Sequence, residues 1–315
     1  MKMSDALGCA GGAISLLLAS ILIPFVGPFF SLLIPLPFLY YSTKLGLIEG
    51  IKLAAAAVGV IGLAAYLAGY SRIILPALEF GIVGVVLAEL FRRRLSLGST
   101  VFLATLFMLV IGLGMLGIVS LSKGMGPMEM VLSYLGGHLD AAVQTYEDGA
   151  PSPLAAQELE AYVKAFMATI SQVYPSLMII GTGFALWLNI VIAKPLFRLG
   201  KLAYPEFAPM DRWQAPDHLV WGLIAAGFAL FLSSEGVRFL AVNALIVILA
   251  IYLFHGLSIV VFFLNKFHVP SWIRLGIYFL IIIQQLFLIV LTFAGLFDQW
   301  IDFRKIHRRA DSQTM

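Results

Sequence analysis

Charge is scarce in this sequence. Only 12% of its 315 residues are charged, whereas 61% are hydrophobic. An average soluble domain has about 25% charged residues and about 45–50% apolar ones. A monomeric globule with so few polar side chains could not cover its surface in water. The composition therefore excludes an ordinary soluble domain.

Cysteine is nearly absent as well. Cys9 is the single cysteine, which excludes an internal disulfide and any metal site that needs several cysteine ligands. The five histidines are scattered and show no metal-ligand spacing. We therefore expect neither a metal nor another cofactor.

The common catalytic motifs are also missing. The sequence has no phosphate-binding loop, no Gly-x-Ser-x-Gly turn and no His-Glu-x-x-His pair. It has no soluble basic domain of the kind that binds nucleic acid. We therefore expect no enzymatic activity and no nucleic-acid partner.

Long apolar runs fill most of the chain. A helix of about 20 apolar residues crosses the ~30 Å of hydrocarbon in a bilayer. The short alternating segments of barrel strands do not appear. The sequence therefore predicts an all-α fold, a polytopic transmembrane helix bundle. Its apolar segments fall at roughly 6–23, 25–42, 45–69, 73–91, 98–120, 173–193, 219–234, 239–264 and 272–297.

The number of crossings depends on segment 219–234. Its uninterrupted apolar core, Leu219 to Leu232, is shorter than a typical span. We expect that this segment does not cross, which gives eight crossings and places both termini and more of the basic residues inside. The alternative is nine crossings. Lys2 precedes an apolar stretch without a clear small-residue cleavage site before Pro24, which predicts a retained first helix. The expected location is the cytoplasmic (inner) membrane of a bacterium, with the lipid bilayer as the first partner.

One long polar stretch, 121–172, interrupts the apolar segments. It is acidic and has basic residues on both flanks, which indicates the outer face of the membrane. Apolar residues recur at helical spacing over 128–146, and a second helix is expected with Ser152 as its N-cap and Pro153 at its first position. The two amphipathic helices would form a lid or collar, or would lie in the headgroup layer.

The N-terminal part has a recognisable pattern: a small-residue first helix, the turn Pro24–Pro28, a segment with Pro35 and Pro37, and Leu45–Gly50. With this pattern, roughly residues 8–95 resemble the substrate-binding (S) components of energy-coupling-factor vitamin transporters. The resemblance implies a six-helix bundle that docks onto an energising transmembrane and ATPase partner. It divides the chain into an S-component-like bundle with the outer helical loop, 1–200, and a C-terminal extension with a basic tail, 201–315.

Three segments of the C-terminal part are distinctive: Asn243–Val247, Tyr252–Leu257 and Gly295–Lys305. In these segments the chain resembles the YybS-like family, and the likeness extends over essentially the whole chain. Members of that family are bacterial multi-spanning membrane proteins of unknown function. The family supplies no catalytic residues, and glutamine is expected more often than histidine at position 255.

Small residues line one stripe of the first helix. Gly8 lies one turn before Gly12, and Ser15 and Ala19 continue the stripe. Small residues let helix backbones approach closely in lipid. The resemblance to S components implies that this stripe docks the energising partner, and the alternative is packing within the chain.

Glu79 is the candidate ligand-binding residue. It lies about two turns into the fourth apolar segment, where a charge costs at least ~2.5–3.5 kcal/mol unless it has a partner or a wet cavity. Arg72 lies seven residues earlier on the same helical face, near the outer surface. We expect Glu79, with Arg72 and Asn189, to bind a small solute; the alternative for Glu79 and Arg72 is an ion pair that fixes helix register.

Other polar residues inside the expected spans are scattered. Packing between helices is the expected role of each, because interhelical hydrogen bonds by such groups contribute only ~0.6 kcal/mol on average. His255 could alternatively serve as a ligand or proton site. The set is Asn189, Asn243, His255, Gln284 and Gln285.

The last apolar segment ends in a mixture of aromatic and charged residues. Trp300 stands where indole rings prefer the membrane boundary. Arg304 and Lys305 can bind anionic headgroups at ~1 kcal/mol each. We interpret these three residues as an interfacial anchor, with a docking peptide for a cytoplasmic partner as the alternative.

These observations favour one function and leave a second open. The first is a small-solute-binding or transport subunit in which the solute enters from outside, reaches Glu79 and depends on a separate energising partner. The second is a non-transporting scaffold for envelope assembly or cell-shape machinery. A membrane-embedded enzyme ranks third, because acids within the spans are few.

Overall fold

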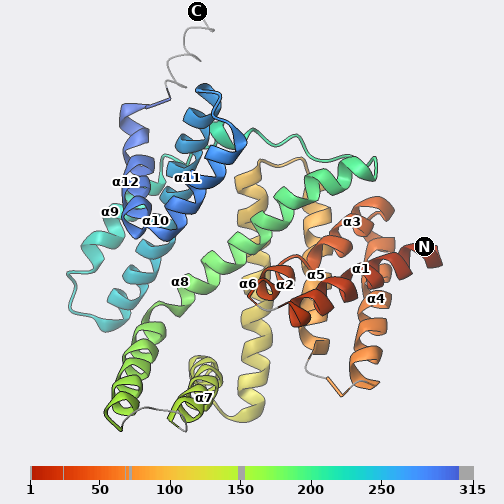
Figure 1. The fold of residues 1–315 in the computed structure, drawn as a ribbon, viewed down its shortest axis with the longest axis horizontal. Coiled ribbons are helices and arrows are strands. Elements are labelled where there is room, and N and C mark those ends of the chain that lie inside the picture. The colour runs from red at the N-terminus through yellow and green to blue at the C-terminus, as the bar shows by residue number, and fades with distance from the viewer. Residues whose placement is uncertain (1, 24, 68, 71–72, 148–152, 305–315) are drawn as a thin grey trace, which may run out of the picture. The chain divides into compact units, whose positions relative to one another are not determined.

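The computed structural model is helical throughout its described part (Figure 1). It describes residues 2–23, 25–67, 69–70, 73–147 and 153–304. The prediction of an all-α chain is confirmed for these residues. The helices are α1 (Met3–Leu22), α2 (Gly27–Ser31), α3 (Pro35–Leu45), α4 (Leu47–Leu67), α5 (Ile74–Arg92), α6 (Leu97–Lys123), α7 (Pro127–Glu147), α8 (Pro153–Leu199), α9 (Leu219–Ala229), α10 (Glu235–Lys266), α11 (Ser271–Ile283) and α12 (Gln285–Ile301), with one 3-10 turn, η2 (Met210–Arg212).

Six described helices are long and apolar enough to cross a membrane: α1, α4, α5, α6, α8 and α10. The pair α11 and α12 makes a seventh span if it acts as one broken helix. The chain is therefore a multi-pass membrane protein, with fewer helices of spanning length than the eight or nine expected.

Segment 25–42 accounts for the difference between seven spans and the eight expected, and segment 219–234 is, as expected, too short to add a further one. The segment expected over 25–42 is divided between α2, which has 5 residues, and α3, which has 11. In the segment expected over 219–234, α9 also has only 11 residues, or about 16 Å at the rise of an α-helix. Neither stretch contains a helix that reaches across ~30 Å of hydrocarbon by its length.

The last apolar segment is broken rather than continuous. We expected one helix over 272–297, but α11 and α12 meet at Gln284 with a bend of 100°. Gln284 has extended backbone angles, φ −95° and ψ 102°, and so ends one helix and begins the next. No proline or glycine adjoins this residue, so the usual sequence signal of a kink is missing.

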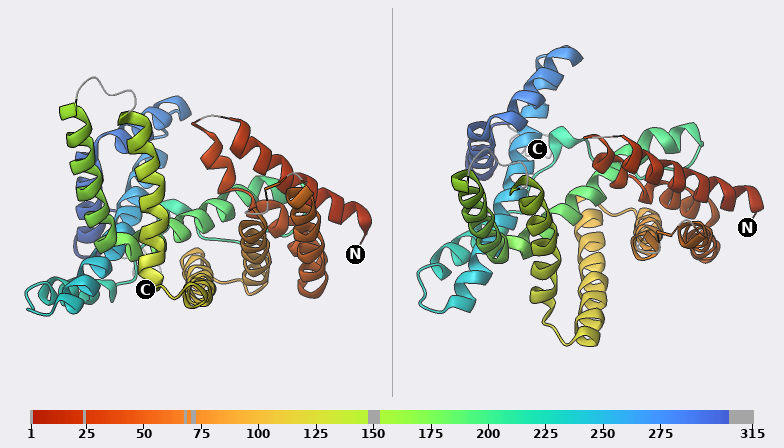
Figure 2. Two further views of the ribbon diagram at one scale, coloured as in Figure 1. Left: turned by 90° about the horizontal axis from the view of Figure 1, so that it is seen from below. Right: turned by 60° about the horizontal axis from the view of Figure 1, so that its bottom comes forward.

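The polar stretch between the apolar segments is helical, as predicted. The helix expected over 128–146 is α7, and the next helix begins at Pro153; Ser152 lies outside the described residues. That second helix does not stop before the membrane but continues through the next apolar segment, so α8 has 47 residues. α7 and the first part of α8 run side by side (Figure 2).

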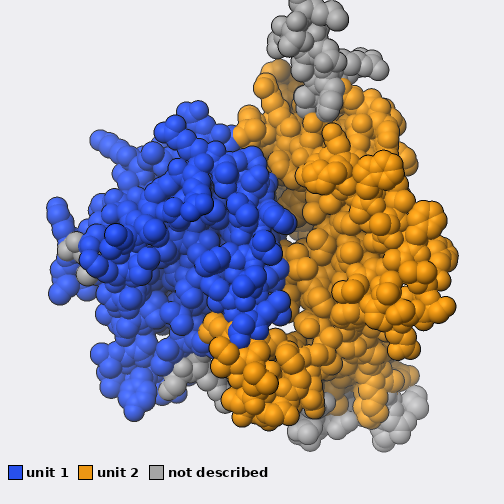
Figure 3. Space-filling view, turned by 180° about the vertical axis from the view of Figure 1, so that it is seen from behind, with its two compact units in different colours: residues 1–114, 181–207 blue, residues 115–180, 208–315 orange. Residues whose placement is uncertain are grey.

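The chain divides into two compact units, coloured separately in Figure 3. Unit 1 comprises residues 1–114 and 181–207, and unit 2 comprises residues 115–180 and 208–315. The sequence analysis places a different boundary at residue 200, between an S-component-like bundle and a C-terminal extension. That division concerns function and membrane topology, and it stays a prediction.

Unit 1 is held together by apolar packing of α1, α3, α4, α5 and part of α8. Gly84 of α5 lies so close to α3 that a Cβ there would overlap Phe38 and the backbone nitrogen of Leu39. The chain's cysteine, Cys9, is fully buried in this core. Edge-to-face ring contacts extend the packing to the segment after α8; the rings are Tyr40, Phe91, Phe197, Tyr204 and Phe207.

Unit 2 is organised around α10. The Asn243 side chain accepts a hydrogen bond from the Ser176 amide at 2.9 Å and donates one to the Gln172 carbonyl at 2.7 Å. This fixes α10 against the middle of α8 and matches the packing role expected for Asn243. On other faces, α10 packs against α9, η2 and α12.

Candidate functional site

Two of the three residues predicted to bind a ligand, Glu79 and Asn189, lie in the described part of unit 1. Glu79 is exposed on α5, and no ion pair joins it to another described residue. Asn189 is buried on α8, where its amide donates to the carbonyl oxygens of Leu32 at 2.7 Å and Ala185 at 2.8 Å. Arg72 lies outside the described residues. No hydrogen bond in the described part of the chain links Glu79 to Asn189.

A groove of about 280 Å³ runs beside α5 in the same unit. Its walls come from α4 and α5, with one ring from α6. Every lining side chain is apolar or absent, which suits an acyl chain or another helix better than a polar solute. The lining residues are Ile51, Ala54, Ala55, Val58, Leu78, Gly81, Ile82, Val85, Val86 and Phe107.

The small-residue stripe of α1 is used in part within the chain. A Cβ at Gly8 would overlap the hydroxyl of Tyr41, and one at Gly12 would press on Pro37 at 3.2 Å. These two glycines therefore allow α3 to approach α1. Ser15 remains exposed and Ala19 half-buried.

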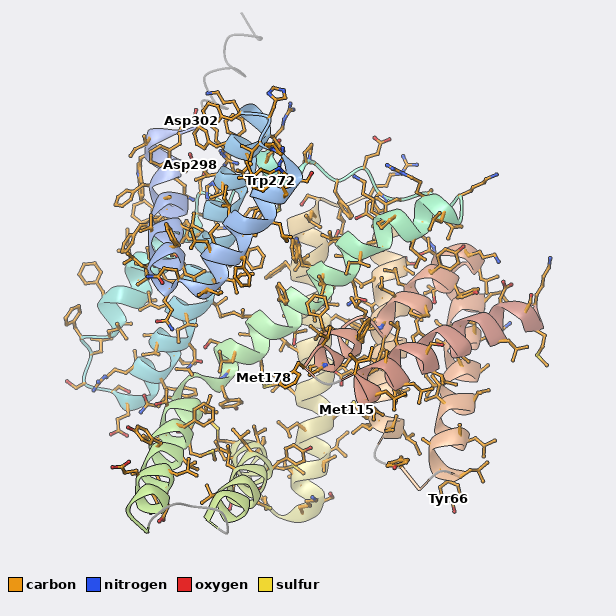
Figure 4. All side chains as sticks on the ribbon, in the orientation of Figure 1. Tyr66, Met115, Met178, Trp272, Asp298 and Asp302 are labelled. Carbon is orange, nitrogen blue, oxygen red and sulfur yellow. The ribbon has the colours of Figure 1, made fainter. Side chains whose placement is uncertain are left out.

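Among the described residues, the most densely connected polar cluster lies in unit 2. It is formed by His255 of α10, Asp298 of α12 and Arg304, which follows α12; Figure 4 labels Asp298 near the end of that helix. The exposed fractions of these residues are 0%, 1% and 2%. Three ionisable side chains are thus enclosed in a predominantly apolar unit.

Two glycines allow α10 and α12 to meet at this point. A Cβ at Gly256 would overlap the carbonyl oxygen of Leu291, and a Cβ at Gly295 would overlap that of Tyr252. Both obstacles are backbone atoms, which cannot swing aside as a side chain can. The glycines therefore bring His255 and Asp298 within reach of each other.

Arg304 closes the cluster with one end of its guanidinium. Its Nη2 lies 2.9 Å from Asp298 Oδ2 and 2.9 Å from His255 Nε2. The carboxylate and the imidazole are themselves 3.1 Å apart. The second carboxylate oxygen, Oδ1, accepts the backbone N–H of Phe303 at 2.8 Å.

The other nitrogen of the same guanidinium reaches a different set of oxygens. Nη1 donates to Ser258 Oγ at 2.8 Å and to the carbonyl oxygens of Asp211 and Trp213 at 2.9 and 3.1 Å. The Ser258 hydroxyl also donates to the Trp213 carbonyl at 2.7 Å. The segment around η2 is thereby tied to α10 and to the end of α12.

These contacts fix the hydrogen-bonding role of His255. A guanidinium has hydrogens to donate and no acceptor, so Nε2 must accept from Arg304 and the ring proton of a neutral imidazole lies on Nδ1. Without Arg304 in contact, the ring proton could instead lie on Nε2, and this N–H could donate a hydrogen bond to Asp298. Arg304 therefore selects the tautomer of the ring.

The site also adjoins a polar pocket of about 270 Å³, lined by Asp211, Phe262, Asn265 and Lys266. Asp211 Oδ2 accepts a hydrogen bond from Asn265 at 2.9 Å. Its other carboxylate oxygen is buried without a partner among the described residues. Asp211 thus belongs to both regions, through its backbone to the cluster and through its side chain to the pocket.

The C-terminal anchor lies only partly where the sequence suggested. Trp300 is 62% exposed on α12, in keeping with a side chain at the membrane boundary. Arg304 instead directs its guanidinium into unit 2, so the structure does not present it to lipid headgroups. Lys305 lies outside the described residues.

The sequence points to two members of this cluster, but separately. His255 is one of the scattered polar residues within the expected spans, and Arg304 is expected at the membrane surface. A usable signal was present, since the segments behind the C-terminal resemblance, Tyr252–Leu257 and Gly295–Lys305, contain the histidine, both close-packed glycines, the aspartate and the arginine.

Comparison with known proteins supplies a family for this chain. No curated protein and no solved structure matches it. The model of one family, described as predicted membrane protein (DUF2232), matches residues 13–299, which include His255 and Asp298. That description names neither a YybS-like protein nor a transporter component. Because the match spans most of the sequence, the chain belongs to this family of predicted membrane proteins, DUF2232.

Proposed function

We propose that the chain is a small-solute-binding or transport subunit of the bacterial cytoplasmic (inner) membrane. It works with a separate energising partner and performs no chemical conversion itself. The need for a partner comes from the resemblance of the N-terminal part to S components. This resemblance also implies a six-helix bundle. In this proposal the solute site lies in unit 2.

The buried His255–Asp298–Arg304 cluster carries the proposal. Charged groups inside membrane domains are costly and characteristically line substrate or ion pathways. A buried ion pair is often no more stabilising than apolar residues of the same volume. Stability alone therefore gives little reason to keep Asp298 and Arg304 here, whereas recognition of a polar solute gives a direct one.

Native mass spectrometry of the protein extracted in mild detergent tests this function. We expect a stoichiometric small-molecule adduct on the wild-type chain that is lost in Asp298→Asn and equally in Asp298→Asn with Arg304→Gln, which leaves no buried charge without a counterion. The matched control is Glu89→Gln, which alters a partly exposed ion pair in unit 1 and should keep the adduct. A wild-type spectrum with lipid adducts alone would contradict the proposal.

A second variant, Glu79→Ala, tests the location of the solute site. Glu79, with Arg72 and Asn189, remains the alternative ligand set that the sequence suggested. If the adduct disappears in Glu79→Ala and persists in Asp298→Asn, the solute site belongs to unit 1. We expect instead that the adduct disappears in Asp298→Asn and persists in Glu79→Ala.

One observation favours the alternative function, a non-transporting scaffold in envelope assembly or cell-shape machinery. The apolar groove on α4, α5 and α6 has small residues, Ala54, Ala55 and Gly81, where a partner helix could approach closely. Under this alternative the chain binds another membrane protein and no solute.

Filling the groove distinguishes the two functions. Ala55→Leu adds volume at an exposed position of the groove, whereas Val60→Leu adds volume at an exposed position of α4 outside it. The scaffold function predicts a co-purifying partner that Ala55→Leu alone loses, together with a wild-type spectrum free of solute. The transport function predicts that both variants keep the solute adduct.

A further inference from the structure

The surroundings of Arg304 resemble a binding site more than a conventional salt bridge. Acceptors converge on its two terminal nitrogens from three parts of unit 2: α10, α12 and the segment around η2. We call this set the acceptor frame. It consists of Asp298 Oδ2, His255 Nε2, Ser258 Oγ and the carbonyl oxygens of Asp211 and Trp213, at 2.8–3.1 Å from Arg304.

The acceptor frame has support that does not come from Arg304. Asp298 Oδ1 is held by the Phe303 amide, and Ser258 is held by the Trp213 carbonyl. Gly256 and Gly295 set the distance between α10 and α12. The acceptors are therefore positioned largely by groups other than the cation they surround.

The cation enters the frame from outside the helices. Asp302 ends α12 in a left-handed conformation with φ 45°, which turns the chain and directs Arg304 back toward α10. The guanidinium is thus borne by the segment after α12, whereas all five acceptors belong to earlier parts of the chain. A small change in that short segment would remove the cation together with the Phe303 amide that holds Asp298 Oδ1, and all five acceptors would remain on α10, α12 and the segment around η2.

We propose that the acceptor frame is a binding site for a small organic cation with a guanidinium or primary ammonium group, and that Arg304 closes it as an intramolecular ligand. This inference rests on the proposed solute-binding function and names the class of solute. When the solute binds, it takes the place of the Arg304 side chain, and the segment after α12 moves away.

The donor set favours an organic cation over a metal ion. No third His, Cys, Asp or Glu side chain joins His255 and Asp298 to form a metal-binding group within the described residues. A guanidinium presents five N–H donors in a fixed plane, and Arg304 already satisfies the frame with such a fork. An ammonium group, with three donors, can satisfy only part of it at once.

The adjoining pocket offers a path to the frame. The Asp211 side chain lines it, while the carbonyl oxygen of the same residue belongs to the frame. Asp211 Oδ1 is a further acceptor of this residue, buried and without a partner among the described residues. A solute with a cationic head and a short polar body fits both regions.

Methylguanidinium is the probe that tests the frame directly. In the full chain in detergent, Arg304→Ala removes the intramolecular ligand, and millimolar methylguanidinium should bind saturably and raise Tm by about 5 °C. The same concentration should not shift the wild-type Tm, and adding Asp298→Asn to Arg304→Ala should weaken binding at least tenfold. Absence of saturable binding to Arg304→Ala, or equal binding to the double variant, would overturn the proposal.

The wild-type chain tests the displacement, and it remains informative if Arg304→Ala does not fold. A spin label on Phe303→Cys, an exposed position beside Arg304, should become more mobile as methylguanidinium is added. Where Arg304→Ala also folds and binds the probe, the methylguanidinium concentration at half-maximal response of the wild-type label should be at least tenfold higher than that for binding to the variant. The reason is that the probe must compete with Arg304 in the wild-type chain. An unchanged label throughout the titration would overturn the displacement.

The two proposals fail in distinguishable ways. In one case Arg304→Ala binds methylguanidinium and the wild-type label responds, but native mass spectra of the wild-type chain show no natural solute. This result would support the acceptor frame and contradict the solute-binding function. If a natural solute is found that lacks any cationic group, the function stands and the assigned solute class falls.

Discussion

The two units use similar apolar sequences in different ways. Unit 1 encloses aliphatic and aromatic side chains, and its ion pairs keep a partner open to the surroundings: the side chain of Lys44 is 43% exposed in its pair with Asp5. Unit 2 encloses a complete ion pair, since the side chains of Asp298 and Arg304 are both 0% exposed. Unit 1 thus shows the apolar packing that holds helices together. Unit 2 adds buried polar groups that such packing does not require.

Both units nevertheless bring helices together by the same means. Gly84 in unit 1 and Gly256 in unit 2 each stand where a Cβ would overlap a neighbour. What lies beside the glycine differs: a phenylalanine core in unit 1 and a charged cluster in unit 2. Close approach of helices is therefore a shared architectural device, and the charge is an addition to it.

The largest effect is expected from removing one charge of the buried pair. Asp298→Asn leaves the Arg304 guanidinium enclosed without a counterion, which costs about 3–5 kcal/mol. Thermal unfolding in detergent should show a large loss of stability. The double variant Asp298→Asn with Arg304→Gln should recover part of it, because neither charge then remains. An unchanged Tm in Asp298→Asn would contradict the distinction between the enclosed ion pair of unit 2 and the partly exposed pairs of unit 1.

The next effect tests the shared device. Gly256→Ala and Gly84→Ala should each lower stability by about 1–3 kcal/mol, because the added methyl group overlaps backbone atoms. Gly276→Ala and Gly112→Ala are the controls, one for each unit, because a Cβ at either position meets open space. These controls should unfold at or slightly above the wild-type temperature, since alanine favours the helix.

The sequence was sufficient for the membrane location and for most helices. Composition and long apolar runs identified α4, α5, α6 and α10, and amphipathic spacing identified α7. The bend at Gln284 was not predictable from a proline or glycine signal, and the continuity of α8 was hidden by the change from amphipathic to wholly apolar spacing within one helix. The residue pattern of a segment indicates the structure of that segment alone. The bend at Gln284 and the continuity of α8 depend on how neighbouring segments are joined.

The candidate site was harder to predict for a related reason. Asp298 and Arg304 lie near the end of an apolar segment, where charges usually face the membrane surface. Their burial depends on His255 and Ser258, which lie about 45 residues earlier in the sequence. Such a contact cannot be inferred from spacing within one helix.

A smaller effect is expected from the aromatic packing at the end of unit 1. Tyr204 donates a hydrogen bond to the Ile190 carbonyl at 2.8 Å, so Tyr204→Phe should cost about 1 kcal/mol. Burial raises the pKa of Tyr204 to about 12, above the value near 10 of an unfolded tyrosine. The neutral phenol therefore contributes its full stability below about pH 10 and loses it as the pH rises toward 12.

Thermal unfolding as a function of pH checks this prediction. Between about pH 10 and pH 12 the wild-type chain should lose slightly more stability than Tyr204→Phe, which has no phenol to ionise at that position. Parallel curves for the two proteins would show that Tyr204 makes no such contribution.

The smallest effect should come from the surface pair that contrasts with Asp298 and Arg304. Glu89 lies 2.9 Å from Arg92 and 3.6 Å from Arg93 at the end of α5, with part of each side chain exposed. Glu89→Gln should change stability by about 0.5 kcal/mol or less. A loss as large as that of Asp298→Asn would mean that exposure does not distinguish the two pairs.

The enclosed position of Cys9 has a practical consequence for chemical labelling. A thiol with no exposed surface reacts slowly with maleimides and nitroxide reagents while the chain is folded. A cysteine introduced after α12 can therefore be modified selectively on an otherwise native chain. Slow reaction at Cys9 would in turn report opening of the α1–α3–α4 core, so one reagent can follow both units through two well-separated rates.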